Sequence, residues 1–109
     1  MFYVCNNQIT MIRGDTLRLS LIIKDSEGKL YTPDEGDVIR FAAKYSFDDK
    51  NIIISKNILN DTLELVLDPN DTKLLKQPSS LVYDIQITHT DGTVDTFLYG
   101  TLLIKHEVD

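Results

Sequence analysis

The chain has 109 residues, of which 42% are hydrophobic and 26% are charged, proportions typical of globular proteins that exclude a disordered or fibrous chain. Its 17 acidic and 11 basic side chains give a formal net charge of −6, and the basic residues are scattered, which excludes nucleic acid as an expected partner. No apolar run approaches the roughly 20 residues of a membrane-spanning helix, and no secretory leader is recognisable, so we expect no membrane association.

Alternation of apolar and polar residues dominates the first part of the chain. Residues 8–13 and 16–24 are expected to be strands, with a turn at Gly14 between them. One face of the second strand is aliphatic throughout: Leu17, Leu19, Leu21 and Ile23. A short extended piece at residues 29–31 and a loop with Pro and Gly at residues 32–37 follow. A period of two residues predicts strands with one buried face.

Three more strands are expected in the middle of the chain, over residues 38–45, 52–59 and 63–67. The inward face of the first is expected to hold Ile39, Phe41, Ala43 and Tyr45. A short helix near residues 69–76 then interrupts the β pattern, because Asp68 can cap a helix whose first position suits proline.

The strongest hairpin signal lies near the C-terminus. Residues 81–89 and 94–105 are expected to pair through a turn at Asp91 and Gly92. A β-bulge near Gly100 is expected, because the aromatic and aliphatic residues of the last strand have opposite parity. The bulge would turn both pairs to one face, Phe97 with Tyr99 and Leu102 with Ile104.

These elements predict an all-β, immunoglobulin-like antiparallel β-sandwich of about seven strands with one short helix near residues 69–76. We expect a single domain over residues 1–109. The Cys and Trp residues typical of antibody domains are missing, so the likeness is to the architecture alone.

Residues that could carry catalysis are few. The two histidines, His89 and His106, lie in no recognisable motif, and Cys5 has no histidine near it in the sequence. We therefore assign no catalytic, cofactor-binding or metal-binding residue and expect a protein that is not an enzyme and has no cofactor.

Two binding alternatives remain. The acidic residues at 34–37 and 48–49 could provide oxygen ligands for Ca²⁺, although their spacing does not match a known calcium loop. The tyrosines at positions 3, 31, 45, 83 and 99 could provide a stacking surface for sugars, which makes a carbohydrate-binding module the alternative function.

Ile22 and Val38 are the candidate partner-contact residues. Each is an apolar residue on the face of its strand that is otherwise polar. Apolar residues that remain on an outer face, together with exposed strand edges, are typical contacts between proteins.

Several short motifs occur in a fixed order along the chain. They are the segments 13–16, 31–33 with 36–41, 68–72, 83–86 and 91–94, followed by Gly100. This series resembles small immunoglobulin-like structural proteins of phages and prophages of Gram-positive bacteria, including the N-terminal domain of phage baseplate upper proteins. The resemblance extends from Arg13 to Val108.

This resemblance implies a virion, tail or baseplate component that is made in the cytoplasm of the bacterial host. Its expected partners are other virion or tail proteins, or further copies of the same chain. It would act through protein contacts rather than catalysis.

Overall fold

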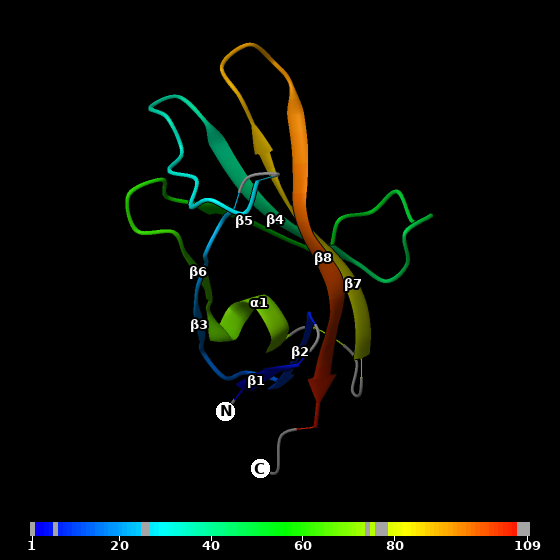
Figure 1. Cartoon of the computed structure of the whole chain (residues 1–109). Helices are drawn as coiled ribbons and strands as arrows, with labels where there is room; N and C mark the ends of the chain where they lie inside the picture. The colour runs from blue at the N-terminus through cyan, green and yellow to red at the C-terminus, as the bar shows by residue number, and fades with distance from the viewer. Residues whose placement is uncertain (1, 6, 25–26, 74, 76–78, 107–109) are drawn as a thin grey trace.

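The computed structural model describes residues 2–5, 7–24, 27–73, 75 and 79–106, apart from the side chains of residues 2–5 and 97. Its strands form two sheets (Figure 1). The larger sheet has the strand order β1 (Phe2–Cys5), β2 (Gln8–Ile12), β8 (Val94–Lys105), β7 (Ser79–Thr88), β4 (Val38–Lys44) and β5 (Ile54–Ile58). The smaller sheet pairs β3 (Leu17–Ser20) with β6 (Glu64–Leu67).

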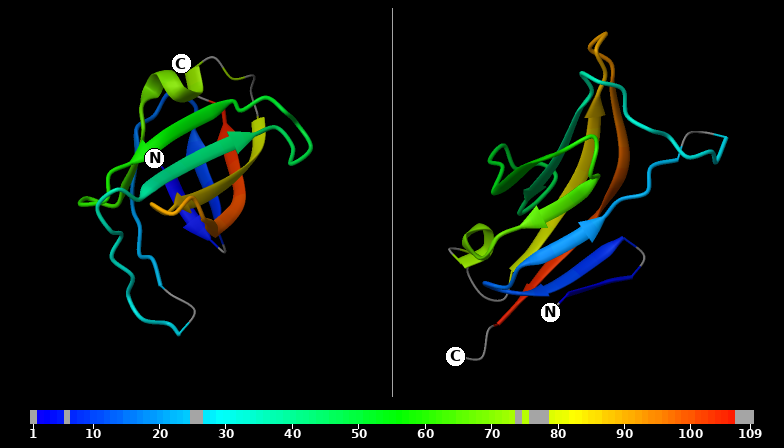
Figure 2. Two further views of the ribbon diagram at one scale, coloured as in Figure 1. Left: turned by 90° about the horizontal axis from the view of Figure 1, so that it is seen from above. Right: turned by 90° about the vertical axis from the view of Figure 1, so that its left-hand side faces the viewer.

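The larger sheet curls around the smaller one, and the two layers enclose one apolar core (Figure 2). The expected all-β sandwich is therefore confirmed. The order β8-β7-β4-β5 in one layer and the β3-β6 pair in the other agree with the connectivity of immunoglobulin-like sandwiches.

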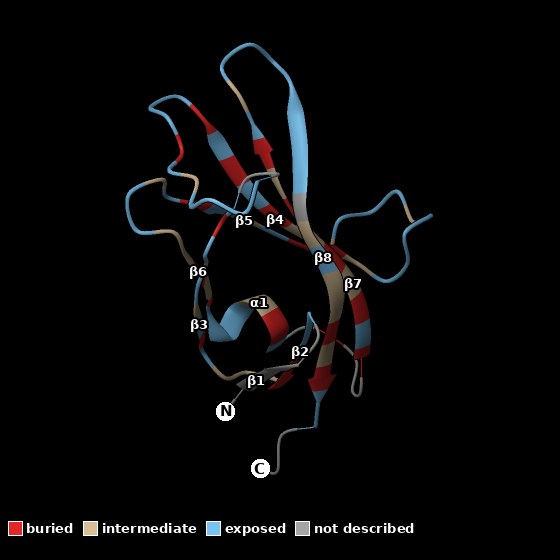
Figure 3. Cartoon of the chain, viewed as in Figure 1, coloured by how far each residue is buried: buried red, intermediate tan, exposed pale blue. Residues whose placement is uncertain are grey.

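Alternate residues of β4 and β7 build the core, as the stripes of buried positions along these strands show (Figure 3). Fully buried positions include Leu17, Phe41, Leu65, Ile85 and Leu102. Burying each such side chain contributes about 1.5–3 kcal/mol. Tyr45, expected to point inward, is instead 45% exposed because β4 ends one residue before it.

The sheet is mixed rather than wholly antiparallel, which corrects the sequence-based expectation. β2 runs parallel to β8, with Ile9 opposite Leu102 and Met11 opposite Ile104. This parallel register is compatible with a single core, because both strands place their buried side chains on the same face of the sheet. The described residues also form eight strands rather than about seven, since β1 pairs with β2 in a hairpin that the alternation did not indicate.

The helix α1 (Pro69–Lys73) begins at proline as expected but is shorter than residues 69–76. Residues 74 and 76–78 lie outside the described part of the chain. The capping differs from the expectation: the carboxylate of Asp71 accepts the backbone N–H of Asp68 at 2.6 Å. The buried hydroxyl of Thr72 accepts the N–H of Gly14 at 2.8 Å, which fastens α1 to the turn after β2.

The bulge in β8 lies at Phe97 rather than at Gly100. Ile85 pairs with Leu98 whereas Gln86 pairs with Thr96, so residue 97 is the extra one. As a result Leu98 packs against the core, in phase with Leu102. Tyr99 is left on the outer face with 66% exposure, so the expected shared face of Tyr99 and Leu102 is wrong.

Gly100 has a different role, which is to let the backbone approach closely. A Cβ atom at Gly100 would lie 2.1 Å from the carbonyl oxygen of Asn7. That oxygen also accepts the hydroxyl of Tyr83, the residue opposite Gly100, at 2.6 Å. Tyr83 in turn stacks on Phe41, with ring centroids 5.4 Å apart. The missing side chain therefore allows the β1–β2 turn to rest on the core.

We predict that Gly100→Ala lowers the free energy of unfolding by about 1–3 kcal/mol, because the added methyl group must displace the backbone of Asn7. Urea denaturation measures the change. The control is Thr96→Ala at an exposed position of the same strand, which should stay within about 0.5 kcal/mol of the unmodified protein. Equal midpoints for both variants would refute the role of Gly100.

Candidate functional site

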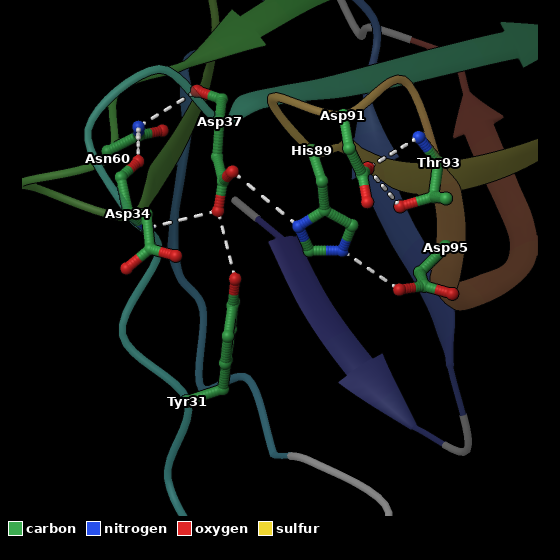
Figure 4. Close-up of polar contacts among 8 residues, drawn as sticks. All are labelled: Tyr31, Asp34, Asp37, Asn60, His89, Asp91, Thr93 and Asp95. Atoms are coloured by element: carbon green, nitrogen blue, oxygen red, sulfur yellow. Dashed lines mark hydrogen bonds and ion pairs between the residues drawn. The ribbon is translucent and has the colours of Figure 1, made fainter.

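Three loops that are far apart in the sequence meet at one end of the sandwich (Figure 4). They are the segment before β4, the turn between β5 and β6, and the β7–β8 hairpin. The expected hairpin is confirmed, with Gly92 at φ +89° in a turn closed by the N–H of Gly92 and the carbonyl of His89.

The carboxylate of Asp37 lies at the centre, with its side chain only 2% exposed. It accepts the hydroxyl of Tyr31 at 2.9 Å and the backbone N–H of Asp34 at 3.0 Å. Its other oxygen lies 3.5 Å from Nδ1 of His89. A buried carboxylate needs such partners because leaving it unpaired is costly.

His89 connects the hairpin to this carboxylate. Its Nε2 lies 2.9 Å from the carboxylate of Asp95, and its ring meets the ring of Tyr31 edge-on with centroids 6.2 Å apart. We call the four side chains Tyr31, Asp37, His89 and Asp95 the Asp37–His89 cluster. Each nitrogen of the imidazole thus faces an anion.

The charges in the Asp37–His89 cluster shift one another's pKa values. The hydrogen bond to Asp95, followed by the charge of Asp37, raises the pKa of His89. Burial raises the pKa of Asp37, but its hydrogen bonds with Asp34 and Tyr31 and the charge of His89 outweigh burial and lower it. The hydrogen bond to Asp37, with desolvation, raises the pKa of Tyr31 to about 12. The cluster therefore favours an imidazolium between two carboxylates rather than a free base.

Asn60 joins the β5–β6 turn to the segment before β4. Its side-chain amide donates to the carbonyl of Asp37 at 2.8 Å and to the carbonyl of Asp34 at 3.1 Å. Asn60 thus crosslinks two stretches of backbone through one side chain.

A shallow, open groove of about 610 Å³ lies between these two stretches. One wall comes from residues 32–39 and the other from residues 57–61, so we call it the 32–61 groove. Val38 and Leu59, which are 52% and 65% exposed, contribute apolar surface to it. Because Asn60 ties the walls together, the groove is already formed in the free protein.

One of the two sequence-based contact candidates lines the 32–61 groove. Val38 is exposed as expected and lines the 32–61 groove at the start of β4. Ile22 is also exposed, at 73%, but it follows β3 of the smaller sheet and is not part of the groove lining. The 32–61 groove therefore includes one of the two candidates.

Other sequence-based candidates are separated. His89 lies in the turn before β8 and His106 directly follows β8, so roughly 35 Å of strand separates them and they share no site. Among the described residues, no group of three or more His, Cys, Asp or Glu is placed to hold a metal ion. Within that part of the chain, no helix has the length and apolar character to cross a membrane.

The expected tyrosine surface is largely dispersed. Tyr83 is buried, and Tyr31 is half-buried with its hydroxyl bound to Asp37. Tyr45 and Tyr99 remain exposed, and the side chain of Tyr3 lies outside the described part.

The sequence gives no reason to pair Asp37, one of the acidic residues at 34–37, with His89. Their only local signal is position: Asp37 follows a turn glycine, and His89 precedes the Asp91–Gly92 turn. A carboxylate and a histidine placed at loops that converge in a sandwich could be paired only once the strand order is known.

Comparisons of the chain with protein-family models, with curated proteins and with solved structures found no match. The resemblance to phage structural proteins gains no support from them and stays a prediction.

We predict that the free energy of unfolding falls as the pH rises from about 6 to 9. The pKa of His89 is raised in the folded state, so its contribution is complete below the ordinary value of about 6.5 and is lost above its folded pKa. His89→Gln should remove most of this decrease in urea titrations, and His106→Gln should leave it unchanged. A decrease that is the same in both variants would refute the assignment.

We also predict that Gly36→Ala destabilises the protein more than Gly28→Ala. Both glycines have positive φ, at +97° and +81°, so both variants carry backbone strain of about 1–2 kcal/mol. A Cβ at Gly36 would also lie 2.8 Å from Cγ2 of Thr90 in the hairpin, whereas Gly28 has open space. Urea denaturation should show an extra loss of about 1 kcal/mol for Gly36→Ala. Equal losses would mean that the hairpin does not press on this loop.

Proposed function

We propose that the protein is a non-enzymatic structural or assembly protein of a phage-type particle, a virion, tail or baseplate component that acts through protein contacts. The observation that carries the protein-contact part is the 32–61 groove, which presents exposed Val38 and Leu59 in a preformed frame. Other particle proteins, or further copies of the chain, are the proposed partners.

Rigidity of the groove supports this proposal. The double hydrogen bond of Asn60 crosslinks the two walls, and the Asp37–His89 cluster holds one wall against the hairpin. A surface ordered before binding loses less conformational entropy when a partner docks. Such a site suits a component that must fit a partner in one orientation.

Exposed apolar side chains in the groove support it as well. Val38 and Leu59 stand on opposite walls, beside the buried Ile39 and Ile58. Apolar surface that water can reach inside a concave site favours association with another protein.

The β5 edge of the larger sheet offers a weaker contact. β5 lies at that edge, but its central Lys56 shares the parity of the buried Ile54 and Ile58 and binds Asp71 at 2.9 Å. An inward-pointing charge on an edge strand discourages strand addition. We therefore place the contact in the groove rather than along the strand edge.

The assignment to a phage-type particle rests on the ordered motifs of the sequence. A fold of this kind hosts many functions, so the sandwich alone does not select one. The all-β fold is nevertheless the one that the resemblance implies.

We predict that the protein is present in purified particles from a lysogenic host that carries its gene. The variant Val38→Asp with Leu59→Asp should reduce its amount in particles about tenfold or more, because two charges would replace the apolar surface of the groove. Quantitative mass spectrometry of gradient-purified particles measures this.

The matched control carries Ile22→Asp with Leu30→Asp, two residues that are 73% and 74% exposed outside the groove. It should enter particles like the unmodified protein. Absence of the unmodified protein from particles would overturn the phage assignment.

A further inference from the structure

We propose that the 32–61 groove binds a cationic, extended segment of a partner protein. An apolar side chain of that segment would contact Val38 and Leu59, and a Lys or Arg side chain would lie between Glu35 and Asp61. This inference rests on the proposed function and specifies the chemistry of the partner.

The charge of the groove lining has one sign. Glu35, Asp37 and Asp61 are in it, and no Lys, Arg or His is. Arg40 lies two residues along β4 from Val38, but its Nε donates to Ser55 at 2.9 Å. Ser55 pairs with Ala42, farther from the groove, so Arg40 leans away from the lining.

Two of the three carboxylates are open to a partner. Asp37 is buried and engaged with Tyr31 and His89, so it holds the wall in place. Glu35 and Asp61 are exposed and stand on opposite walls. A cationic side chain entering between the walls would meet a carboxylate on each side, which is the complementarity that steers and orients charged partners.

The apolar part of the lining indicates that a partner must offer an apolar group as well as a positive charge. Pro33, Ile39 and Ile58 are buried beside the exposed Val38 and Leu59. Small cations would leave this surface in water. A peptide segment that alternates apolar and basic side chains would cover both kinds of surface.

The shape and lining favour a peptide over a sugar. The groove is open to solvent, and its volume of about 610 Å³ is large enough for a few side chains of a peptide. Its lining contains no aromatic residue that could stack on a sugar ring. Backbone and side chains of a short extended segment therefore match it better.

The test uses the full-length, ¹⁵N-labelled protein and a capped hexapeptide of alternating Arg and Leu. NMR titration should shift the amide signals of residues 32–39 and 57–61, and raising the salt from about 0.05 M to 0.5 M should weaken binding several-fold. The variant Glu35→Lys with Asp61→Lys should weaken it about tenfold or more. Hexapeptides with Glu or Gln in place of Arg should bind far more weakly.

The control variant is Asp48→Lys, an exposed acidic residue outside the groove lining, which should bind the Arg–Leu peptide like the unmodified protein. The inference is overturned if Asp48→Lys and Glu35→Lys with Asp61→Lys weaken binding equally, or if the three peptides bind alike. Binding of oligosaccharides in the groove without peptide binding overturns it too.

The same variants separate this inference from the proposed function. If Glu35→Lys with Asp61→Lys enters particles normally while Val38→Asp with Leu59→Asp does not, the cationic partner is refuted and the particle role stands. If the unmodified protein binds the Arg–Leu peptide in the groove but is absent from particles, the cationic site stands and the particle role is refuted.

Discussion

The buried carboxylate of Asp37 is the constraint on which the loop end of this sandwich depends. An ion removed from water must be paired and hydrogen-bonded, so the segment before β4 cannot move without breaking its contacts to Tyr31 and His89. Asn60 extends the constraint to the next turn by holding the carbonyl of Asp37. Asp37 thus joins three loops, two through its carboxylate and the third through its backbone carbonyl, and the 32–61 groove follows from their arrangement.

The β7–β8 hairpin connects the core to the loops around Asp37. Gly100 and Tyr83 let the β1–β2 turn rest on the inner face of the larger sheet. The extra residue at Phe97 shifts the pairing register between β7 and the hairpin end of β8. In this register Asp95 lies opposite Ile87, and its carboxylate is 2.9 Å from Nε2 of His89. The bulge is therefore a feature of the site as well as of the sheet.

Much of the fold could be predicted from local patterns, because alternation directly reports which side chains a strand buries. The inward faces of the strands at Leu17 and Ile39 are confirmed, as are the start of α1 at Pro69 and the hairpin at Gly92. The exposed state of Val38 could also be predicted from its parity. The parallel pairing of β2 with β8 could not, since it joins the two ends of the chain and leaves no short-range signal.

By itself, the sequence determined that the chain is β-rich, which residues face the core, and that it carries excess negative charge, because periodicity and composition act over a few residues. Only the tertiary structure decided that Gly100 serves a backbone contact, that Val38 lines a groove, and that Asp37, His89 and Asn60 meet. These outcomes depend on strand order and on burial of a charge, which are properties of the assembled layers rather than of any single segment.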